Sequence, residues 1–153
     1  MREIIFRGKR VDNGEWVEGY FCKKYFQETP HERSVIQYKT ERDSKMWKPD
    51  YMAEEIIPET VSEFTGLTDK NGKKIFEGDI VWFEDESPAN YEYHDCTEMR
   101  CGSIEYGDNC FYITDRIAVE MEDLIYDGKL DVEVIGNIHD NPELLKGESN
   151  EAD

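Results

Sequence analysis

Short apolar runs separated by turn residues predict a chain built mainly from β-strands. Apolar residues at 4–6 and 16–21 flank a turn cluster at 12–14, an arrangement typical of two antiparallel strands joined by a tight turn. The runs 100–106 and 110–114 flank a similar cluster and indicate a second hairpin. The hydrophobic pattern therefore favours local antiparallel pairing over a layout of alternating helices and strands.

The segment 64–83 combines the densest turn chemistry with the most regular apolar pattern. Asn71 and Gly72 are predicted to form a two-residue type I′ turn, because both central residues of that turn need a positive φ angle. Gly78 marks a second tight corner, and the β-branched and aromatic run 80–83 then indicates a strand. We expect the rest of the fold to be organised around this segment.

Other parts of the chain carry weaker signals. Alternation over 34–38 predicts a strand, whereas the polar stretch 40–49 predicts an exposed loop. The run 117–126 begins with a period of two and ends with helical spacing, so its type is left open. A final strand is expected over 132–135, and the proline that begins 142–147 indicates one or two helical turns.

The predicted core consists of large apolar residues in these strands and turns. Its expected members are Phe6, Trp16, Tyr20, Ile36, Phe64, Leu67, Ile75, Ile80, Trp82, Ile104, Phe111, Ile113, Leu124, Val134 and Ile138.

Three segments follow one another in a recognisable order over nearly the whole chain. They are REIIFRG at 2–8 with NGEWVEGY at 13–20, then FTGL at 64–67 with DKNGK at 69–73 and EGDIV at 77–81, and finally VIGNIHDNPELL at 134–145. In these segments the chain resembles the YopX family of small bacteriophage and prophage proteins. The resemblance implies a mostly β fold with a small SH3-like barrel in the C-terminal part, and a phage setting in the host cytoplasm. It implies little about function, because the family has no assigned biochemical role.

We predict a mainly β fold with little helix, divided into two parts. An N-terminal β-hairpin subdomain is expected over 1–63. A small β-barrel subdomain, SH3-like according to the family resemblance, is expected over 64–147. Within it we expect a long acidic loop at 84–99, and after it a disordered polar tail at 148–153.

Length and cysteine usage narrow the class of protein. The 153 residues suffice for one domain or two small subdomains that bury a core without disulfides or metals. No apolar run reaches the length of a transmembrane helix, and the segment from Met1 lacks the apolar stretch of a secretory signal. We therefore expect a cytoplasmic protein of a bacterial host cell, with no membrane contact and with its four cysteines reduced.

Charge is distributed unevenly over the chain. Residues 1–83 hold 16 acids against 14 bases, whereas residues 84–153 hold 20 acids against 4 bases, so nearly all of the net charge of −18 lies in the second part. Such a surface repels the phosphate backbone of nucleic acids. The simplest interpretation is a solubilising surface, and the sharper ones are attraction to a basic partner and mimicry of nucleic-acid charge.

The best metal candidate is the set His94, Cys96, Cys101 and Cys110, because imidazole nitrogen and thiolate sulfur are the ligands that zinc prefers. The spacing is unfavourable, since the nearest thiols, Cys96 and Cys101, have four residues between them and no Cys-x2-Cys or Cys-x3-Cys pair occurs. Cys101 and Cys110 would be neighbours across the second hairpin without any metal. We predict free thiols and no metal site.

Catalytic and cofactor motifs are absent from the sequence. His31, His94 and His139 belong to no catalytic motif, and no Gly-Lys-Ser/Thr sequence forms a phosphate-binding loop. We assign no catalytic residue and no cofactor. If nucleic acid binds at all, we expect it at Lys70, Lys73 and Lys74 on the tip of the central hairpin.

Three functional hypotheses follow from these observations. The first is a non-enzymatic accessory protein that binds an unknown host or phage protein through its acidic half. The second is a nucleic-acid-associated module built on the small barrel, which rests on fold analogy and is opposed by the charge. The third and least favoured is a metal or thiol enzyme. Unpaired edges of β-sheets would also permit self-association.

Overall fold

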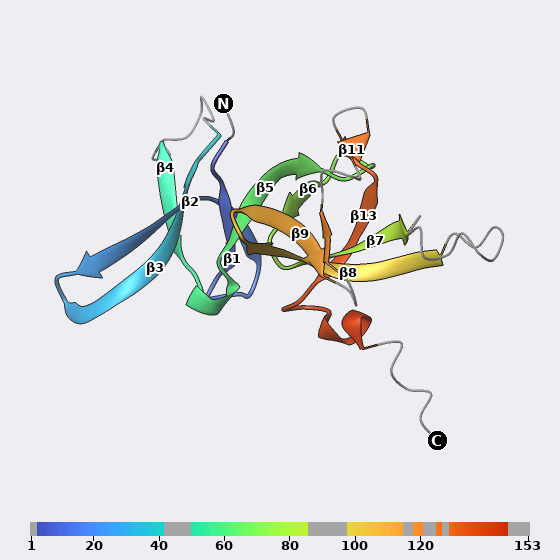
Figure 1. The fold of residues 1–153 in the computed structure, drawn as a ribbon. Coiled ribbons are helices and arrows are strands. Elements are labelled where there is room, and N and C mark those ends of the chain that lie inside the picture. The colour runs from blue at the N-terminus through green and yellow to red at the C-terminus, as the bar shows by residue number, and fades with distance from the viewer. Residues whose placement is uncertain are drawn as a thin grey trace, which may run out of the picture. The chain divides into compact units, whose positions relative to one another are not determined.

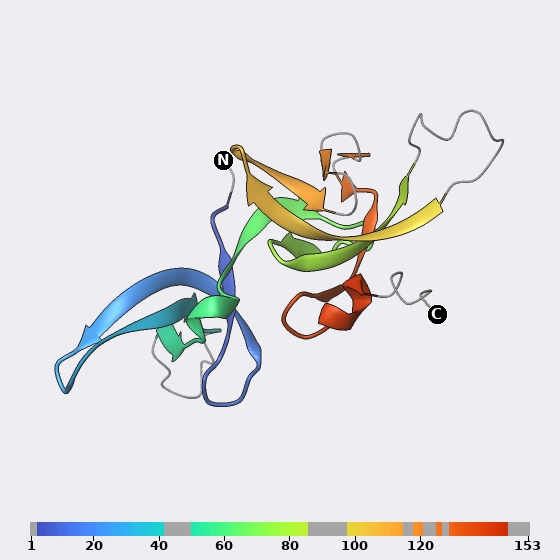
Figure 2. The same cartoon turned by 60° about the horizontal axis from the view of Figure 1, so that its bottom comes forward.

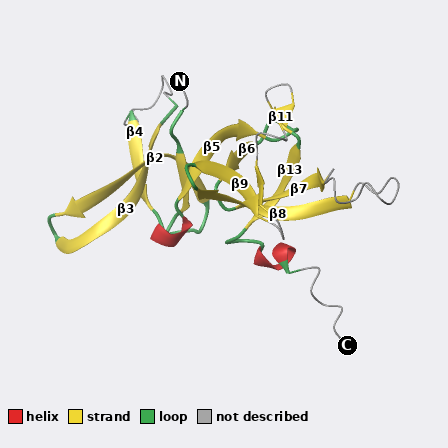
Figure 3. Cartoon of the chain, viewed as in Figure 1, coloured by secondary structure: helices red, strands yellow, loops and turns green. Residues whose placement is uncertain are grey.

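The computed structural model of the protein is mainly β-structure (Figures 1 and 3). It describes residues 3–41, 50–85, 98–114, 118–120, 125–126 and 129–146. Contacts divide the chain into two compact units, Met1–Phe64 and Thr65–Asp153, and each is described by itself. The predicted tail at 148–153 and most of the predicted loop at 40–49 lie outside the described residues.

The first unit is a mainly antiparallel sheet. It contains β1 (Phe6–Lys9), β2 (Trp16–Phe26), β3 (Thr29–Lys39), β4 (Tyr51–Glu55), the 3₁₀ helix η1 (Pro58–Thr60) and the start of β5 (Ser62–Thr68). The strands are ordered β4-β3-β2-β1-β5. The register runs from Lys9 opposite Trp16 to Phe6 opposite Gly19, which confirms the first predicted hairpin.

Strands β2 and β3 are much longer than their neighbours. Strand β1 pairs with β2 only as far as Gly19, and β4 pairs with β3 only from Val35 onward. Beyond those points β2 and β3 continue as a two-stranded arm, the blue and cyan hairpin in Figures 1 and 2.

The core of the first unit lies at the base of this arm, where Val35, Ile36 and Ile56 are at most 3% exposed. Gly8 has no space for a side chain, since a Cβ atom there would lie 2.6 Å from Ile56 Cδ1. The N–H of Ile57 also donates to the carbonyl of Lys9 at 2.8 Å. The segment that follows β4, at Ile56 and Ile57, is thereby held against the end of β1.

The second unit is built on a five-stranded antiparallel sheet. It contains the rest of β5, β6 (Lys74–Phe76), β7 (Asp79–Asp85), β8 (Glu98–Gly107), β9 (Cys110–Thr114), β10 (Ala118–Glu120), β11 (Ile125–Tyr126), β12 (Lys129–Leu130), β13 (Val132–Asn137) and the 3₁₀ helix η4 (Pro142–Leu145). The large sheet has the order β10-β9-β8-β7-β13, and β11 and β12 form a separate pair. The predicted second hairpin is confirmed as β8–β9.

A dense apolar cluster fills one side of this sheet. Its members are Ile75, Val81, Phe83, Ile104, Ile113, Leu130 and Val132, each at most 2% exposed, with Leu67, Phe111 and Val134 packed against them. On the average scale for apolar burial, each such side chain contributes about 1.5–3 kcal/mol relative to an exposed position. This cluster forms the hydrophobic core of the second unit.

The central turn differs from the predicted type I′ geometry. Gly72 has a positive φ of 82°, but Asn71 does not, so the two residues do not form that turn. The buried carboxylate of Asp69 shapes the turn instead: its Oδ1 accepts the N–H groups of Asn71 at 2.9 Å and Lys73 at 2.8 Å. An aspartate that binds backbone N–H groups two residues ahead closes a turn without a second positive φ. Positive φ at both central residues occurs at Asp108 and Asn109 in the β8–β9 hairpin.

The same carboxylate also reaches strand β13. Asp69 Oδ2 accepts the N–H of Val134 at 3.1 Å, and the N–H of Lys70 donates to the carbonyl of Val132 at 3.1 Å. Strand β13 pairs with β7 on its other side. The turn therefore satisfies polar groups on the outer edge of β13, which would otherwise be free to pair with another strand.

The predicted bounds of the acidic loop and part of the predicted core need correction. Glu84, Asp85, Glu98 and Met99 belong to strands β7 and β8, so the predicted loop at 84–99 is too long at both ends. Among the described residues no sheet closes on itself, so a barrel is not confirmed. Three predicted core residues are exposed: Tyr20 by 59%, Trp82 by 45% and Ile138 by 40%. Leu124 lies outside the described residues.

We predict that Asp69→Ala strongly destabilises the second unit. The substitution leaves three backbone N–H groups without their acceptor, and each buried donor left unsatisfied costs about 1–3 kcal/mol. The free energy of unfolding, measured by chemical denaturation, is expected to fall by about 3 kcal/mol or more. The free energy of unfolding of Asp69→Asn should lie between the values of Asp69→Ala and wild type. The amide oxygen of the asparagine can replace one carboxylate oxygen, while its N–H₂ group faces a donor.

Asp131→Ala is the matched control for this experiment, because Asp131 is an exposed aspartate of the same unit. Equal stability losses in Asp69→Ala and Asp131→Ala would contradict the role assigned to Asp69.

Candidate functional site

The three lysines predicted as a nucleic-acid contact lie together on the central turn and the start of β6. Lys70, Lys73 and Lys74 are all exposed. The backbone of Lys73 is fixed by Asp69, while the Lys70 ammonium lies 3.6 Å from the carboxylate of Glu133 on β13. The structure thus brings the three cations together, with an acidic neighbour that offsets part of their charge. Their role in binding stays a prediction.

The cysteines do not meet in the way the sequence suggested. In the β8–β9 register Cys110 lies opposite Gly107, whereas Cys101 lies opposite Trp82 of β7, so the expected neighbour relation of the two cysteines is wrong. Cys22, Cys101 and Cys110 are not joined to one another by disulfide bonds. His94 and Cys96 lie outside the described residues, and within those residues no three His, Cys, Asp or Glu side chains gather in a metal-binding arrangement.

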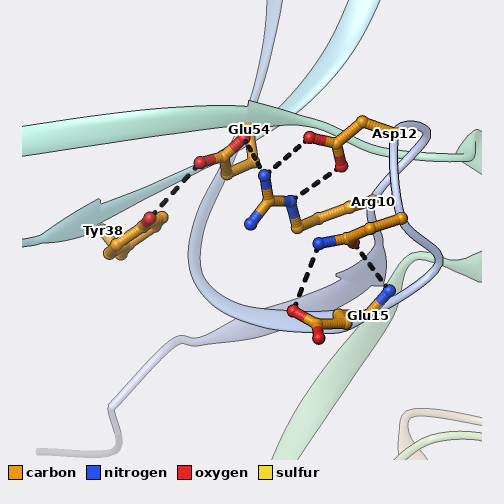
Figure 4. Close-up of polar contacts among 6 residues, drawn as sticks. Arg10, Asp12, Glu15, Tyr38 and Glu54 are labelled. Atoms are coloured by element: carbon orange, nitrogen blue, oxygen red, sulfur yellow. Dashed lines mark hydrogen bonds and ion pairs between the residues drawn. The ribbon is translucent and has the colours of Figure 1, made fainter.

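A polar cluster holds the base of the first unit together (Figure 4). The Arg10 guanidinium lies 2.6 Å from a carboxylate oxygen of Asp12 and 3.2 Å from one of Glu54, and the hydroxyl of Tyr38 donates to Glu54 at 3.4 Å. These side chains come from the β1–β2 connection, from β4 and from β3. The cluster therefore links three separate segments of the unit.

Ionisation in this cluster follows from its contacts. The hydrogen bond from Arg10 lowers the pKa of the Asp12 carboxyl, and the same bond raises the pKa of Arg10. Burial raises the pKa of Tyr38, and repulsion between a phenolate and the Glu54 carboxylate raises it further. The carboxylates of Asp12 and Glu54 each have a donor within reach, so the cluster forms a structural link between its segments.

The most unusual surface of the second unit surrounds Trp82. The residues on either side of it in β7, Val81 and Phe83, are at most 2% exposed, yet Trp82 is 45% exposed. Successive side chains of a strand point to opposite faces, so Trp82 occupies the face of the sheet that lies opposite the apolar cluster. Large aromatic side chains on an exposed sheet face are a common feature of binding surfaces.

Two further residues extend this apolar surface. Cys101 of β8 lies directly opposite Trp82 and therefore points to the same face. Its thiol donates to the carbonyl of Leu144 at 3.7 Å, which places η4 beside β8 on that face (Figure 1). The side chain of Leu144 is 36% exposed. We refer to Trp82, Cys101 and Leu144 as the Trp82 patch.

Carboxylates border the Trp82 patch. Glu133 of β13 lies opposite Trp82 on the strand next to β7, and Glu84 follows two residues later on the same face. Glu143 precedes Leu144 and is exposed. An apolar centre with an acidic border suits a partner that carries apolar and cationic groups together.

No local sequence pattern directly indicates this patch. The pattern of 80–83 marked Trp82 as a strand residue, and its size placed it in the expected core. The alternation of the strand is one indication, because it assigns Val81 and Phe83 to one face and Trp82 to the other. The contact between Cys101 and Leu144 joins residues 43 positions apart and has no local sequence signal.

Comparison with known proteins places the chain in a family. A family model described as YopX protein matches residues 5–146, which is nearly the whole length. The chain belongs to the YopX family. No curated protein matches the sequence of this YopX family member. Among solved structures, the crystal structure of protein EF1440 from Enterococcus faecalis is similar, with 24% sequence identity, a TM-score of 0.49, and coverage of 95% of this chain and 99% of that chain.

In the described part of this YopX family member, no helix has both the length and the apolar character needed to cross a bilayer.

We predict that Tyr38→Phe weakens the alkaline pH dependence of stability. Because the pKa of Tyr38 is raised in the folded state, the unfolded state loses the phenol proton first, and stability falls as pH rises above the ordinary tyrosine value of 10.0. Chemical denaturation from pH 8 upward should give a shallower decline in Tyr38→Phe than in wild type. Tyr25→Phe is the control, since Tyr25 is 75% exposed and lies outside the cluster. Parallel declines in wild type and Tyr38→Phe would contradict the prediction.

Proposed function

We propose that the protein is a non-enzymatic accessory protein of a phage or prophage that binds another protein in the cytoplasm of the bacterial host. Its acidic C-terminal part recognises a basic surface of a host or phage protein. The resemblance to phage proteins in the three sequence segments supports the setting, and the family itself carries no assigned activity from which an enzyme would follow.

The exposed position of Trp82 is the observation that carries this proposal. Carboxylates are sufficient to make a surface soluble, whereas the half-exposed indole of Trp82 adds apolar area that solubility does not require. Tryptophan is enriched among the residues that contribute most of the binding energy at protein interfaces. Strand β7 is paired on both sides, so the backbone at Trp82 is already ordered before a partner binds, which lowers the entropic cost of binding.

Charge supports the choice of a basic partner. Residues 84–153 carry 20 acids against 4 bases, and carboxylates border the Trp82 patch. Complementary charge speeds the encounter with a basic partner and disfavours acidic ones. The same charge disfavours nucleic acid, whose backbone carries one negative charge per ~1.7 Å of duplex.

We predict that affinity capture with the tagged protein recovers a specific host or phage protein. That protein should survive nuclease treatment and dissociate at raised salt, because its attraction to the acidic part is screened. Neutralising three exposed acids of the second unit (Glu84→Gln, Asp131→Asn, Glu143→Gln) should reduce recovery. The control neutralises three exposed acids of the first unit (Glu3→Gln, Glu28→Gln, Glu41→Gln). Recovery of nuclease-sensitive material alone would overturn the proposal.

The alternative is a nucleic-acid-associated module with a small SH3-like barrel, and the cluster of Lys70, Lys73 and Lys74 on one turn favours it. If nucleic acid binds, the triple substitution of these lysines by Glu should abolish salt-dependent retention of DNA or RNA. A control with Lys24, Lys39 and Lys129 changed to Glu alters the net charge equally. Equal retention by both variants would show that the central turn is not the contact.

A further inference from the structure

Trp16 and Trp82, the two tryptophans in the described strands, have neighbours of opposite charge. In the first unit, the guanidinium carbon of Arg7 lies 4.7 Å from the ring centre of Trp16, and the Lys9 ammonium lies 5.6 Å from it. Both distances are within the range in which a cation is attracted to the face of an indole. Trp16 is thus partnered by cations of its own chain.

Trp82 has no such cation among the described residues, and it is almost half exposed. The residue opposite it on β8 is the thiol Cys101, and the residue opposite it on β13 is the carboxylate Glu133. Glu84 adds a second carboxylate two residues along the same face. An indole face with carboxylates across and along the strand combines the two groups that bind a guanidinium, a π-surface and an anion.

We propose that the Trp82 patch is the docking site for an arginine of a basic protein segment. The guanidinium stacks on the Trp82 ring and donates to Glu133 and Glu84, while the apolar part of the bound segment contacts Leu144. This proposal names the partner chemistry of the protein-binding surface proposed above and rests on that function. The strongly acidic character of residues 84–153 supplies the long-range attraction for such a segment.

Arginine is favoured over lysine for a chemical reason. The planar guanidinium stacks on an aromatic ring and keeps its in-plane donors free for carboxylates, whereas an ammonium is more strongly hydrated and offers no flat surface. Lys70 already approaches Glu133 at 3.6 Å, but both side chains are about half exposed. Such exposed pairs are weak, so an arginine from a partner can replace Lys70.

The test uses two synthetic peptides of eight residues with equal charge, one alternating arginine with glycine and the other alternating lysine with glycine. Binding to the full chain is measured by titration at low salt. We expect the arginine peptide to bind about two- to fivefold more tightly than the lysine peptide, the ratio that stacking on an exposed aromatic ring provides. Trp82→Leu should bring this ratio to about one, because it keeps apolar area but removes the indole.

Two further variants locate the carboxylates. Glu84→Gln combined with Glu133→Gln should weaken the binding of both peptides, while Lys70→Met should tighten the arginine peptide about twofold by releasing Glu133. Lys129→Met removes the same charge from another exposed lysine of the unit and is the control for Lys70→Met. Tyr25→Leu is the control for Trp82→Leu, since it removes a 75% exposed aromatic ring from the first unit. Thermal unfolding of each variant verifies that it folds.

Several outcomes would overturn the proposal. An arginine preference that persists in Trp82→Leu, or that Tyr25→Leu abolishes equally, shows that the Trp82 patch is not the docking site. Concentration-dependent self-association that disappears in Trp82→Leu shows that a second copy of the chain covers the patch. The docking site and the proposed function can be contradicted independently. If a captured protein partner binds Trp82→Leu as well as wild type, the protein-binding function stands and this site is wrong. If no protein is captured while the arginine preference depends on Trp82, the peptide site stands and the cellular function is wrong.

Discussion

The buried carboxylate of Asp69 is the interaction on which the second unit depends most. Two of its hydrogen bonds close the turn between β5 and β6, and the third fixes the N–H of Val134 on β13. A side chain that is 1% exposed thereby joins a local turn to a strand 65 residues away. Because the same turn covers an edge of β13, it stabilises the sheet and also limits unwanted strand pairing.

A sheet fixed in this way can present a large side chain to solvent in a defined orientation. Trp82 lies on β7, which pairs with β8 on one side and β13 on the other, so its backbone is held from both sides. Val81 and Phe83 anchor the same strand in the apolar cluster. Folding has therefore already ordered the backbone at Trp82, so a partner that binds the indole restricts only the side chain. In the first unit, the contacts of Arg10 with Asp12 and Glu54 serve structure in a comparable way.

Local features of the fold were accessible from the sequence, and the errors have a common physical origin. Both hairpins were located correctly because turn residues and flanking β-branched residues act within a few positions. The turn at Asn71 and Gly72 was placed correctly but given the wrong geometry, since Asp69 supplies acceptors that dipeptide preference does not consider. Trp82 was assigned to the core because alternation separates two faces of a strand without stating which face is covered. Lys70, Lys73 and Lys74 lie close together in the chain, whereas Glu133, the neighbour of Lys70, is distant in sequence.

The sequence by itself determined the mainly β character, the membership of the YopX family, the positions of the two hairpins and the concentration of acidic residues after position 83. Each of these depends on composition or on residues close together in the chain. Only the tertiary structure decided that Cys101 lies opposite Trp82 and not near Cys110, that Asp69 reaches Val134, and that Trp82 faces outward. These relations depend on the register of strands that are far apart in sequence, and a register shift of one residue would turn every side chain to the other face.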